Sequence, residues 1–212
     1  MKKLILAYLM AGAVTVPSAF ALPTVSFTDG PGNTGGGEFN AATSADGSFT
    51  TFCLEYTEHI SFGTTYFYQV SDAAKYNNNF PNTDPLSLPT AWLYSKMLDG
   101  TLAGYAHNQT EADNLQRAIW FLEDEKDLSG NAVGVNNSYV TAALNGTGLT
   151  LATKDTAANG AYGVHVMNLW TNPDGTGPSQ DQLIHVPDGG TTLTLLGMGM
   201  GFMALVSRRL RS

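Results

Sequence analysis

Apolar segments at both ends of the chain set the limits of what can fold between them. Residues 1–21 combine a basic start, an apolar run over Leu4–Val16 and a small-residue site ending at Ala21, which is the pattern of a secretory signal peptide. The apolar run is shorter than the ~20 residues that cross a bilayer. We therefore expect cleavage after Ala21 rather than a membrane anchor, and an exported chain.

The C-terminal end carries a second signal, made of a short box, an uncharged apolar stretch and a basic tail. The box is Val186, Pro187, Asp188, Gly189 and Gly190, and the tail (207–212) contains Arg208, Arg209 and Arg211. Residues 191–206 carry no charge. An apolar stretch that ends in clustered arginines stops in the membrane with its basic end in the cytoplasm, so we expect a transmembrane helix over residues 191–206.

This C-terminal order resembles the PEP-CTERM class of sorting signals, in the variant with a Val-Pro-Asp-Ser-Gly box. Gly189 stands where that variant has serine. The resemblance covers residues 187–212 with the box from 186 to 190. It implies a Gram-negative-type envelope, processing near the box by an exosortase-type enzyme, and delivery to the cell surface, outer membrane or extracellular polymer after transient anchoring in the inner membrane. A simple C-terminal membrane anchor is the alternative.

The remaining body, residues 22–186, has a length suited to one domain with its own core. The two ends hold five of the ten basic residues but only Asp188 of the 18 acidic ones, so the body keeps 5 basic and 17 acidic residues, a net charge of about −12. Such a surface repels nucleic acid phosphates, so we expect no nucleic acid partner.

Residue patterning predicts an α+β domain that begins and ends as strands. The expected strands are 24–28, 49–56, 64–70, 162–170 and 182–186, where β-branched and aromatic residues gather. Asp29–Gly37 is expected to be a glycine-rich loop. The strand over 64–70 is expected to pair antiparallel with 49–56 across the turn at 61–63. The sheet is expected to be an antiparallel β-sandwich or barrel-like sheet with a helical insertion.

The insertion is predicted to contain two helices. One begins at Ser87 and ends at Gly100. The other begins with the capping-box pair Thr110 and Asp113 and runs to about Glu123, with the acidic stretch 123–127 solvated at its end. Asn145 and Gly146 suggest a turn, and residues 174–177 a loop.

Cys53 is the only cysteine of the chain. An exported protein usually meets an oxidising compartment, where cysteines pair as disulfides. A single cysteine forms no internal disulfide, so it is an intermolecular partner, a buried thiol or a reactive group. Alternation along residues 49–56 places Phe52, Leu54 and Tyr56 on one face and Cys53 on the other, with Phe49, Thr51 and Glu55.

Gln116 lies beside the apolar stripe of the second predicted helix, in the stretch Leu115–Trp120. Together with Phe52-Cys53-Leu54 and the segment Thr90–Tyr94, this stretch resembles bacterial thioester domains, over about residues 49–125. Glu55 stands where that family often has Asp or Asn, and Leu115 where Thr is frequent. The resemblance implies a surface module with an internal thioester between Cys53 and Gln116.

The chemistry implied is attack of the Cys53 thiolate on the Gln116 side-chain carbonyl, with loss of ammonia. The thioester would then capture an amine on a partner protein or a hydroxyl on a surface polysaccharide, once, so the chain is not expected to be an enzyme. Two alternatives stay open. Cys53 is an inert buried thiol in a structural protein of the exopolysaccharide or biofilm matrix, or it is the nucleophile of a hydrolase with His59, His107 or His165 as base.

No other pattern indicates a cofactor or metal. The four histidines, at 59, 107, 165 and 185, lack metal-ligand spacing. The acidic stretches 123–127 and 174–181 lack the spacing of a calcium loop and are expected to be solvated.

Overall fold

The computed structural model describes residues 22–33, 35–45, 47–75, 84–126 and 129–186. The predicted signal peptide, the predicted transmembrane helix and the basic tail lie outside these residues. In the part of the chain that is described, no helix is long and apolar enough to cross a membrane.

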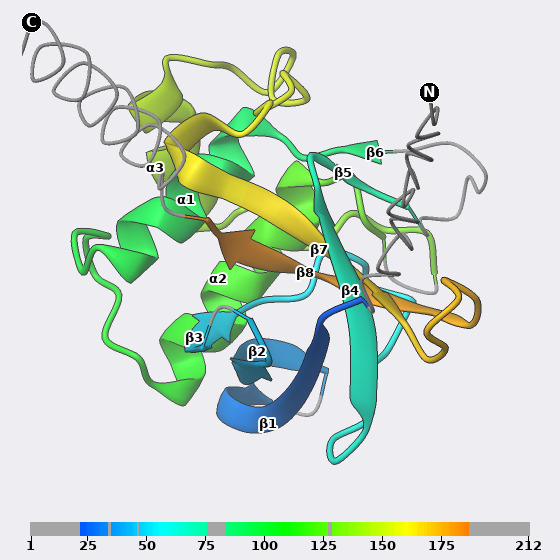
Figure 1. Ribbon diagram of the computed structural model, residues 1–212. Coiled ribbons are helices and arrows are strands. Elements are labelled where there is room, and N and C mark those ends of the chain that lie inside the picture. Colours follow the sequence, from blue (N-terminus) through cyan, green and yellow to red (C-terminus); the bar gives the residue numbers. More distant parts are fainter. Residues whose placement is uncertain (1–21, 34, 46, 76–83, 127–128, 187–212) are drawn as a thin grey trace, which may run out of the picture.

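One antiparallel sheet of six strands organises the domain (Figure 1). Its order is β3-β2-β1-β4-β7-β8, and the strands are β1 (Thr24–Asn33), β2 (Gly36–Thr43), β3 (Ser48–Thr51), β4 (Thr65–Ser71), β7 (Val164–Trp170) and β8 (Pro178–His185). A separate two-stranded ribbon joins β5 (Ala73–Ala74) to β6 (Asp84–Pro85). The sheet curls into a half-barrel, which confirms the predicted α+β class and the barrel-like form, and within the described ranges no second large sheet faces it.

The glycine-rich segment over residues 29–37 is not the loop that the sequence predicted. It forms the end of β1 and the start of β2, and the register shifts between Asp29 and Gly32. Gly32 has φ 144° and Gly37 has φ 128°, which only glycine adopts without strain. The glycine-rich composition of this segment therefore predicted a loop, although its backbone pairs as a bulged hairpin.

The predicted pairing of 64–70 with 49–56 is also wrong. The β4 strand pairs with β1, through Val25 and Tyr66, and with β7, through Tyr68 and Leu169. The chain after β3 turns away to the opposite edge of the sheet, where the Leu183 N–H donates to the Phe52 carbonyl at 3.0 Å. The β8 edge offers free backbone groups, whereas β4 already pairs with β1 on one side and β7 on the other.

Three helices gather on one side of the sheet (Figure 1): α1 (Leu88–Leu98), α2 (Gln109–Leu122) and α3 (Ser138–Thr147). The first begins as predicted, with Ser87 Oγ accepting from the Thr90 N–H. The cap of α2 is Asn108, whose Oδ1 accepts from the Glu111 N–H at 3.0 Å, and not Thr110. The turn predicted at Asn145 and Gly146 is wrong, because both residues lie inside α3.

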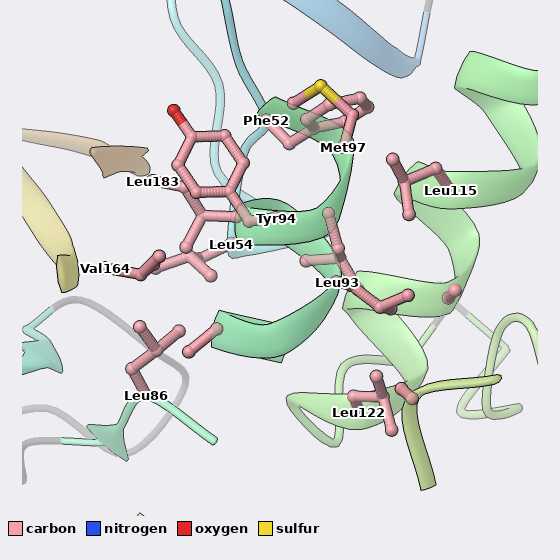
Figure 2. Close-up of a cluster of buried hydrophobic side chains, with 14 of the residues drawn as sticks. Phe52, Leu54, Leu86, Leu93, Tyr94, Met97, Leu115, Leu122, Val164 and Leu183 are labelled. Atoms are coloured by element: carbon pink, nitrogen blue, oxygen red, sulfur yellow. The ribbon is translucent and has the colours of Figure 1, made fainter. Parts of the chain in front are cut away.

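The helices and the sheet enclose a first core, drawn in Figure 2. It includes Phe52, Leu54, Leu86, Leu93, Tyr94, Met97, Leu115, Leu122, Val164 and Leu183. A second core fills the curl of the sheet and consists of Val25, Phe27, Phe39, Ala41, Cys53, Tyr66, Tyr68, Trp120, Met167, Leu169 and Ile184. The predicted alternation of Phe52 and Leu54 against Cys53 is therefore observed, except that Tyr56 packs on the Cys53 side. The buried residues of both cores fall between residues 25 and 184.

Candidate functional site

Cys53 lies where the two edges of the half-barrel meet. It forms an isolated antiparallel bridge with Gln182 of β8. On either side, the Leu54 N–H donates to the Asp181 carbonyl and the Leu183 N–H to the Phe52 carbonyl, both at 3.0 Å. Backbone pairing on both sides fixes the position of Cys53, and its side chain is 1 % exposed.

Gln116 of α2 reaches this seam and meets Cys53 through three contacts. Its Oε1 accepts from the Cys53 N–H at 3.3 Å and from the Cys53 thiol at 3.3 Å. Its Nε2 donates to the Cys53 carbonyl at 2.8 Å. Because a carbonyl C–O bond is about 1.23 Å long, Cys53 Sγ lies within about 4.5 Å of Gln116 Cδ. The two predicted site residues are thus in contact, with the carboxamide hydrogen-bonded to both the N–H and the carbonyl of Cys53.

The tip of the β1–β2 hairpin covers this pair. Gly36 has φ 152°, and a Cβ there would lie 2.6 Å from Trp120 Cη2 and 2.7 Å from Gln116 Cγ. The tip is tied to α2 because the Asn33 N–H donates to Asp113 Oδ1 at 2.7 Å, and the Asn33 side-chain amide donates to the same carboxylate. Asp113, predicted as part of a capping box, instead holds the hairpin. The run of glycines over residues 35–37 was the signal in the sequence for this hairpin tip, but the sequence did not predict that the tip covers Cys53 and Gln116.

Trp120 completes the wall of the site one helical turn after Gln116. Its ring stands edge-on to the Tyr56 ring, with centroids 4.8 Å apart. Its indole Nε1 is buried and has no hydrogen-bond partner in the structure. The sequence placed Trp120 in the same short stretch as Gln116 but assigned it no chemical role.

Two adjoining pockets open onto the pair, and Asn33, Gly35 and Gly36 line both of them. The first, of about 210 Å³, is lined by Gln116, Trp120, Tyr56, Asp113, Arg117 and Val133 besides the hairpin tip. The second, of about 360 Å³, is lined by Cys53, His59, Ile60, Phe62, Phe39, Gln180 and Asp29 besides the tip. One pocket therefore reaches the carboxamide and the other the thiol, on either side of the hairpin.

Burial keeps the thiol neutral. It raises the pKa of the Cys53 thiol well above its usual value, and the charge of Glu55 adds to this rise. The Trp120 indole acts in the opposite direction and lowers the pKa of the thiol. Trp120 is thus the side chain that favours the thiolate, although in the thiol form its N–H makes no regular hydrogen bond.

A buried acidic pair lies behind Cys53. The Asp181 N–H donates to Glu55 Oε2 at 2.8 Å, while Glu55 Oε1 has no partner. Burial, followed by the charge of Asp181, raises the pKa of Glu55 well above its usual value, and burial raises that of Asp181 to about 6. The expectation that the acidic stretch 174–181 is solvated is therefore wrong for Asp181, which accepts from Asn168 Nδ2 at 2.7 Å.

The acidic stretch after α2 is also partly built into the domain rather than solvated. Glu123 Oε1 accepts from Ser87 Oγ at 2.7 Å, and burial raises the pKa of Glu123 to about 7. Glu125 is buried and its Oε2 accepts from the Tyr56 N–H at 3.0 Å. The helix ends at Leu122 with Glu123 as its C-cap, and Asp124 turns the chain back with φ 59°, which directs Glu125 inward.

The histidines of the hydrolase alternative have other neighbours. His107 Nδ1 lies 2.9 Å from Glu38 Oε1, and His165 Nδ1 lies 2.7 Å from Asp72 Oδ1. His59 shares the larger pocket with Cys53, and across the described residues no histidine hydrogen-bonds to the thiol. Within the same ranges, no three His, Cys, Asp or Glu side chains come together in a way that could hold a metal ion.

Comparison with known proteins identifies the C-terminal signal. Residues 185–210 match the family model of the VPDSG-CTERM motif. The match implies an exported, membrane-sorted protein of the PEP-CTERM type that an exosortase-type enzyme processes. No curated protein matches the chain, and no solved structure matches it.

The matched motif begins where the described domain ends. The last strand, β8, ends at His185, and the Val186 N–H donates to the Gly163 carbonyl at 2.8 Å. Residues 187–190 of the predicted box and the arginines of the tail lie outside the described residues. Among the described residues, Ile184 is the last buried member of the two cores, and Val186 of the box packs against the second core.

Proposed function

We propose that this exported chain is a covalent adhesin whose reactive group is an internal thioester between Cys53 and Gln116. The observation that carries the proposal is the contact of Cys53 Sγ with Gln116 Oε1 at 3.3 Å. A sulfur held within about 4.5 Å of the carboxamide carbon needs a shift of about 1 Å to reach the ~3–3.5 Å of attack geometry, and holding the two groups together lowers the entropic barrier of the reaction.

Bond formation needs no oxidant or cofactor. The Cys53 sulfur adds to Gln116 Cδ, the C–N bond of the carboxamide breaks, and ammonia leaves with the thiol proton. The Cys53 N–H, which donates to Gln116 Oε1 at 3.3 Å, is placed to stabilise negative charge on that oxygen in the tetrahedral intermediate. The Cys53 carbonyl accepts from the leaving nitrogen at 2.8 Å and so keeps the amide oriented.

Capture of a partner reverses the formation of the thioester, with a nucleophile of the partner in the place of ammonia. An amine of a protein or a hydroxyl of a surface polysaccharide attacks Gln116 Cδ, the C–S bond breaks, and the proton of the nucleophile passes to the Cys53 sulfur. The partner is left joined to Gln116 as an amide or ester, and no turnover follows. The pocket of about 210 Å³ that Gln116 lines offers the nucleophile a route, while burial of Cys53 limits access of water.

Methylamine tests the capture step directly. After incubation of the purified chain with methylamine, we expect one methylamine per chain, located on Gln116 by peptide mapping, and a thiol newly available for alkylation. Cys53→Ala is the matched control and should take up none. Uptake elsewhere, or uptake that survives Cys53→Ala, would contradict the proposal.

A second candidate is a structural protein of the extracellular matrix with an inert thiol. It is favoured by the 1 % exposure of Cys53 and by the hydrogen bonds that already satisfy both polar atoms of the Gln116 amide. In that case the wild-type chain and Cys53→Ala bind surface polysaccharide equally well, and neither forms a bond that survives boiling in detergent.

A further inference from the structure

The Trp120 indole is a buried donor without an acceptor. Trp120 is 5 % exposed, and its Nε1 has no hydrogen-bond partner in the structure. The indole N–H can only donate, and an unsatisfied buried donor destabilises a folded protein. Two buried acceptors nearby, Glu55 Oε1 and Gln182 Oε1, also have no partner, but the indole is the unpaired donor, so it calls for an acceptor in the reacting group.

The position of the ring limits what that acceptor is. Trp120 follows Gln116 by one turn of α2, so the two side chains lie on the same face of the helix. Trp120 also packs in the second core together with Cys53. On its other sides the ring contacts Tyr56 edge-on and is covered by Gly36. The Trp120 ring is therefore enclosed by the residues of the proposed thioester site and the hairpin tip that covers it.

The other reacting atoms of the site already have backbone partners. Gln116 Oε1 accepts from the Cys53 N–H, and Gln116 Nε2 donates to the Cys53 carbonyl. The sulfur, in contrast, donates to Gln116 Oε1, and hydrogen bonding by the Trp120 indole and by the Cys53 backbone lowers the pKa of the thiol. The indole is the side chain whose presence lowers the pKa of the thiol, so the two groups are close enough to interact.

We infer that the Trp120 indole N–H stabilises the Cys53 sulfur whenever that atom carries negative charge. This occurs twice in the proposed reaction: as the thiolate attacks Gln116 Cδ, and again as the thiolate leaves when a nucleophile captures the carbonyl. The role of Trp120 in the reaction rests on the proposed function. The evidence for the interaction itself is the buried Nε1 that has no partner. A hydrogen bond to an ionised sulfur is much stronger than one to a neutral thiol, which explains why the donor is free in the resting state.

The first test does not need the thioester. In a Gln116→Ala chain, which forms none, the alkylation rate of Cys53 by a small neutral haloacetamide is measured as a function of pH, with and without Trp120→Phe. Phenylalanine keeps most of the ring but lacks the N–H. We expect the thiol pKa to rise by about one unit in the double variant, the shift typical for loss of one charge-assisted hydrogen bond. Trp92→Phe on α1 is the control and should leave the thiol pKa unchanged.

The second test follows the reaction in the full-length chain in mild detergent. Trp120→Phe should slow methylamine capture about tenfold while the dependence on methylamine concentration stays the same. Replacement of Trp120 by benzothienylalanine, which keeps the two-ring shape without the N–H, should slow capture equally. This second variant separates loss of the hydrogen bond from any misfolding caused by the smaller phenylalanine ring.

The outcomes separate the two proposals. A wild-type chain without a thioester overturns the proposed function, and the thiol pKa in the Gln116→Ala background still decides the role of Trp120. An unchanged thiol pKa in the double variant overturns the inference, and so does capture by the benzothienylalanine chain at the wild-type rate.

Discussion

Gly36 lies directly over Gln116, so closely that a single added carbon at position 36 would stand 2.7 Å from Gln116 Cγ. The hairpin tip and the helix that carries the glutamine are far apart in the chain, and the tie between Asn33 and Asp113 holds them together. The candidate site is therefore a buried seam flanked by two pockets, and it is made of the meeting edges of the sheet, one helix face and one glycine-rich cover.

Gly36→Ala should open this cover. The new Cβ would also stand 2.6 Å from Trp120 Cη2, and φ at this position is 152°, so we expect a loss of about 2 kcal/mol in the free energy of unfolding. It should also increase alkylation of Cys53 or hydrolysis of the thioester. Gly35→Ala is the matched control, because nothing lies within 4 Å of a Cβ there. Equal effects of the two variants in urea unfolding would show that the cover does not press on the site.

The Gln116 amide should stabilise the fold even without a thioester. In a Cys53→Ala background the backbone N–H and carbonyl of residue 53 still pair with the Gln116 amide, so adding Gln116→Ala leaves two buried groups unsatisfied. We expect this second change to cost about 2 to 4 kcal/mol in urea unfolding. A cost below about 0.5 kcal/mol would mean that water replaces the amide and reaches the backbone groups of residue 53, which would contradict their burial.

Mild acid should stabilise the domain. Burial raises the pKa of Glu123 and of Glu58 to about 7, whereas in the unfolded chain such groups titrate near 4.5. Between these values the folded state binds more protons than the unfolded state, so the free energy of unfolding falls as pH rises from about 4.5 to about 7. The unfolding midpoint should be several degrees higher at a pH of about 5 than at about 8. Glu123→Gln should flatten this slope, and a midpoint that rises steadily with pH would refute the assignment.

The start of α2 can be tested by its cap. Asn108→Ala removes the side-chain oxygen that accepts from the Glu111 N–H, and we expect a loss of about 1 kcal/mol in stability. Thr110→Ala, at the position that the sequence favoured, should change stability by less than about 0.5 kcal/mol. If Thr110→Ala lowers the thermal unfolding midpoint more than Asn108→Ala does, Thr110 is the N-cap of α2, as the sequence predicted.

The sequence predicted the ends of α1 correctly, because they depend on a few neighbouring residues. Ser87 begins α1 and Gly100 follows its end because capping and left-handed backbone are properties of a few neighbouring residues. The hairpin over residues 29–37 was missed for the opposite reason. Its strands are held by backbone pairing and positive φ at glycine, which leave no side-chain periodicity to detect.

The long-range features of the site were only partly predictable. The resemblance to thioester domains named Cys53 and Gln116, and the structure has the two in contact; the thioester itself stays a prediction. The burial of Glu125 and Asp181 was not predicted, because a run of acidic residues indicates solvent exposure unless its neighbours in space are known. The cover by Gly36 depends on a tie between Asn33 and Asp113, a pairing of distant residues that no local pattern encodes.

The intact mass of the purified domain, residues 22–186, tests the central claim most directly. The thioester predicts a wild-type mass lower than the sequence mass by one ammonia, and full sequence masses for Cys53→Ala and Gln116→Ala. A wild-type domain of full mass, with one thiol that alkylates after unfolding, would contradict the thioester and leave Cys53 as a buried, unreactive side chain.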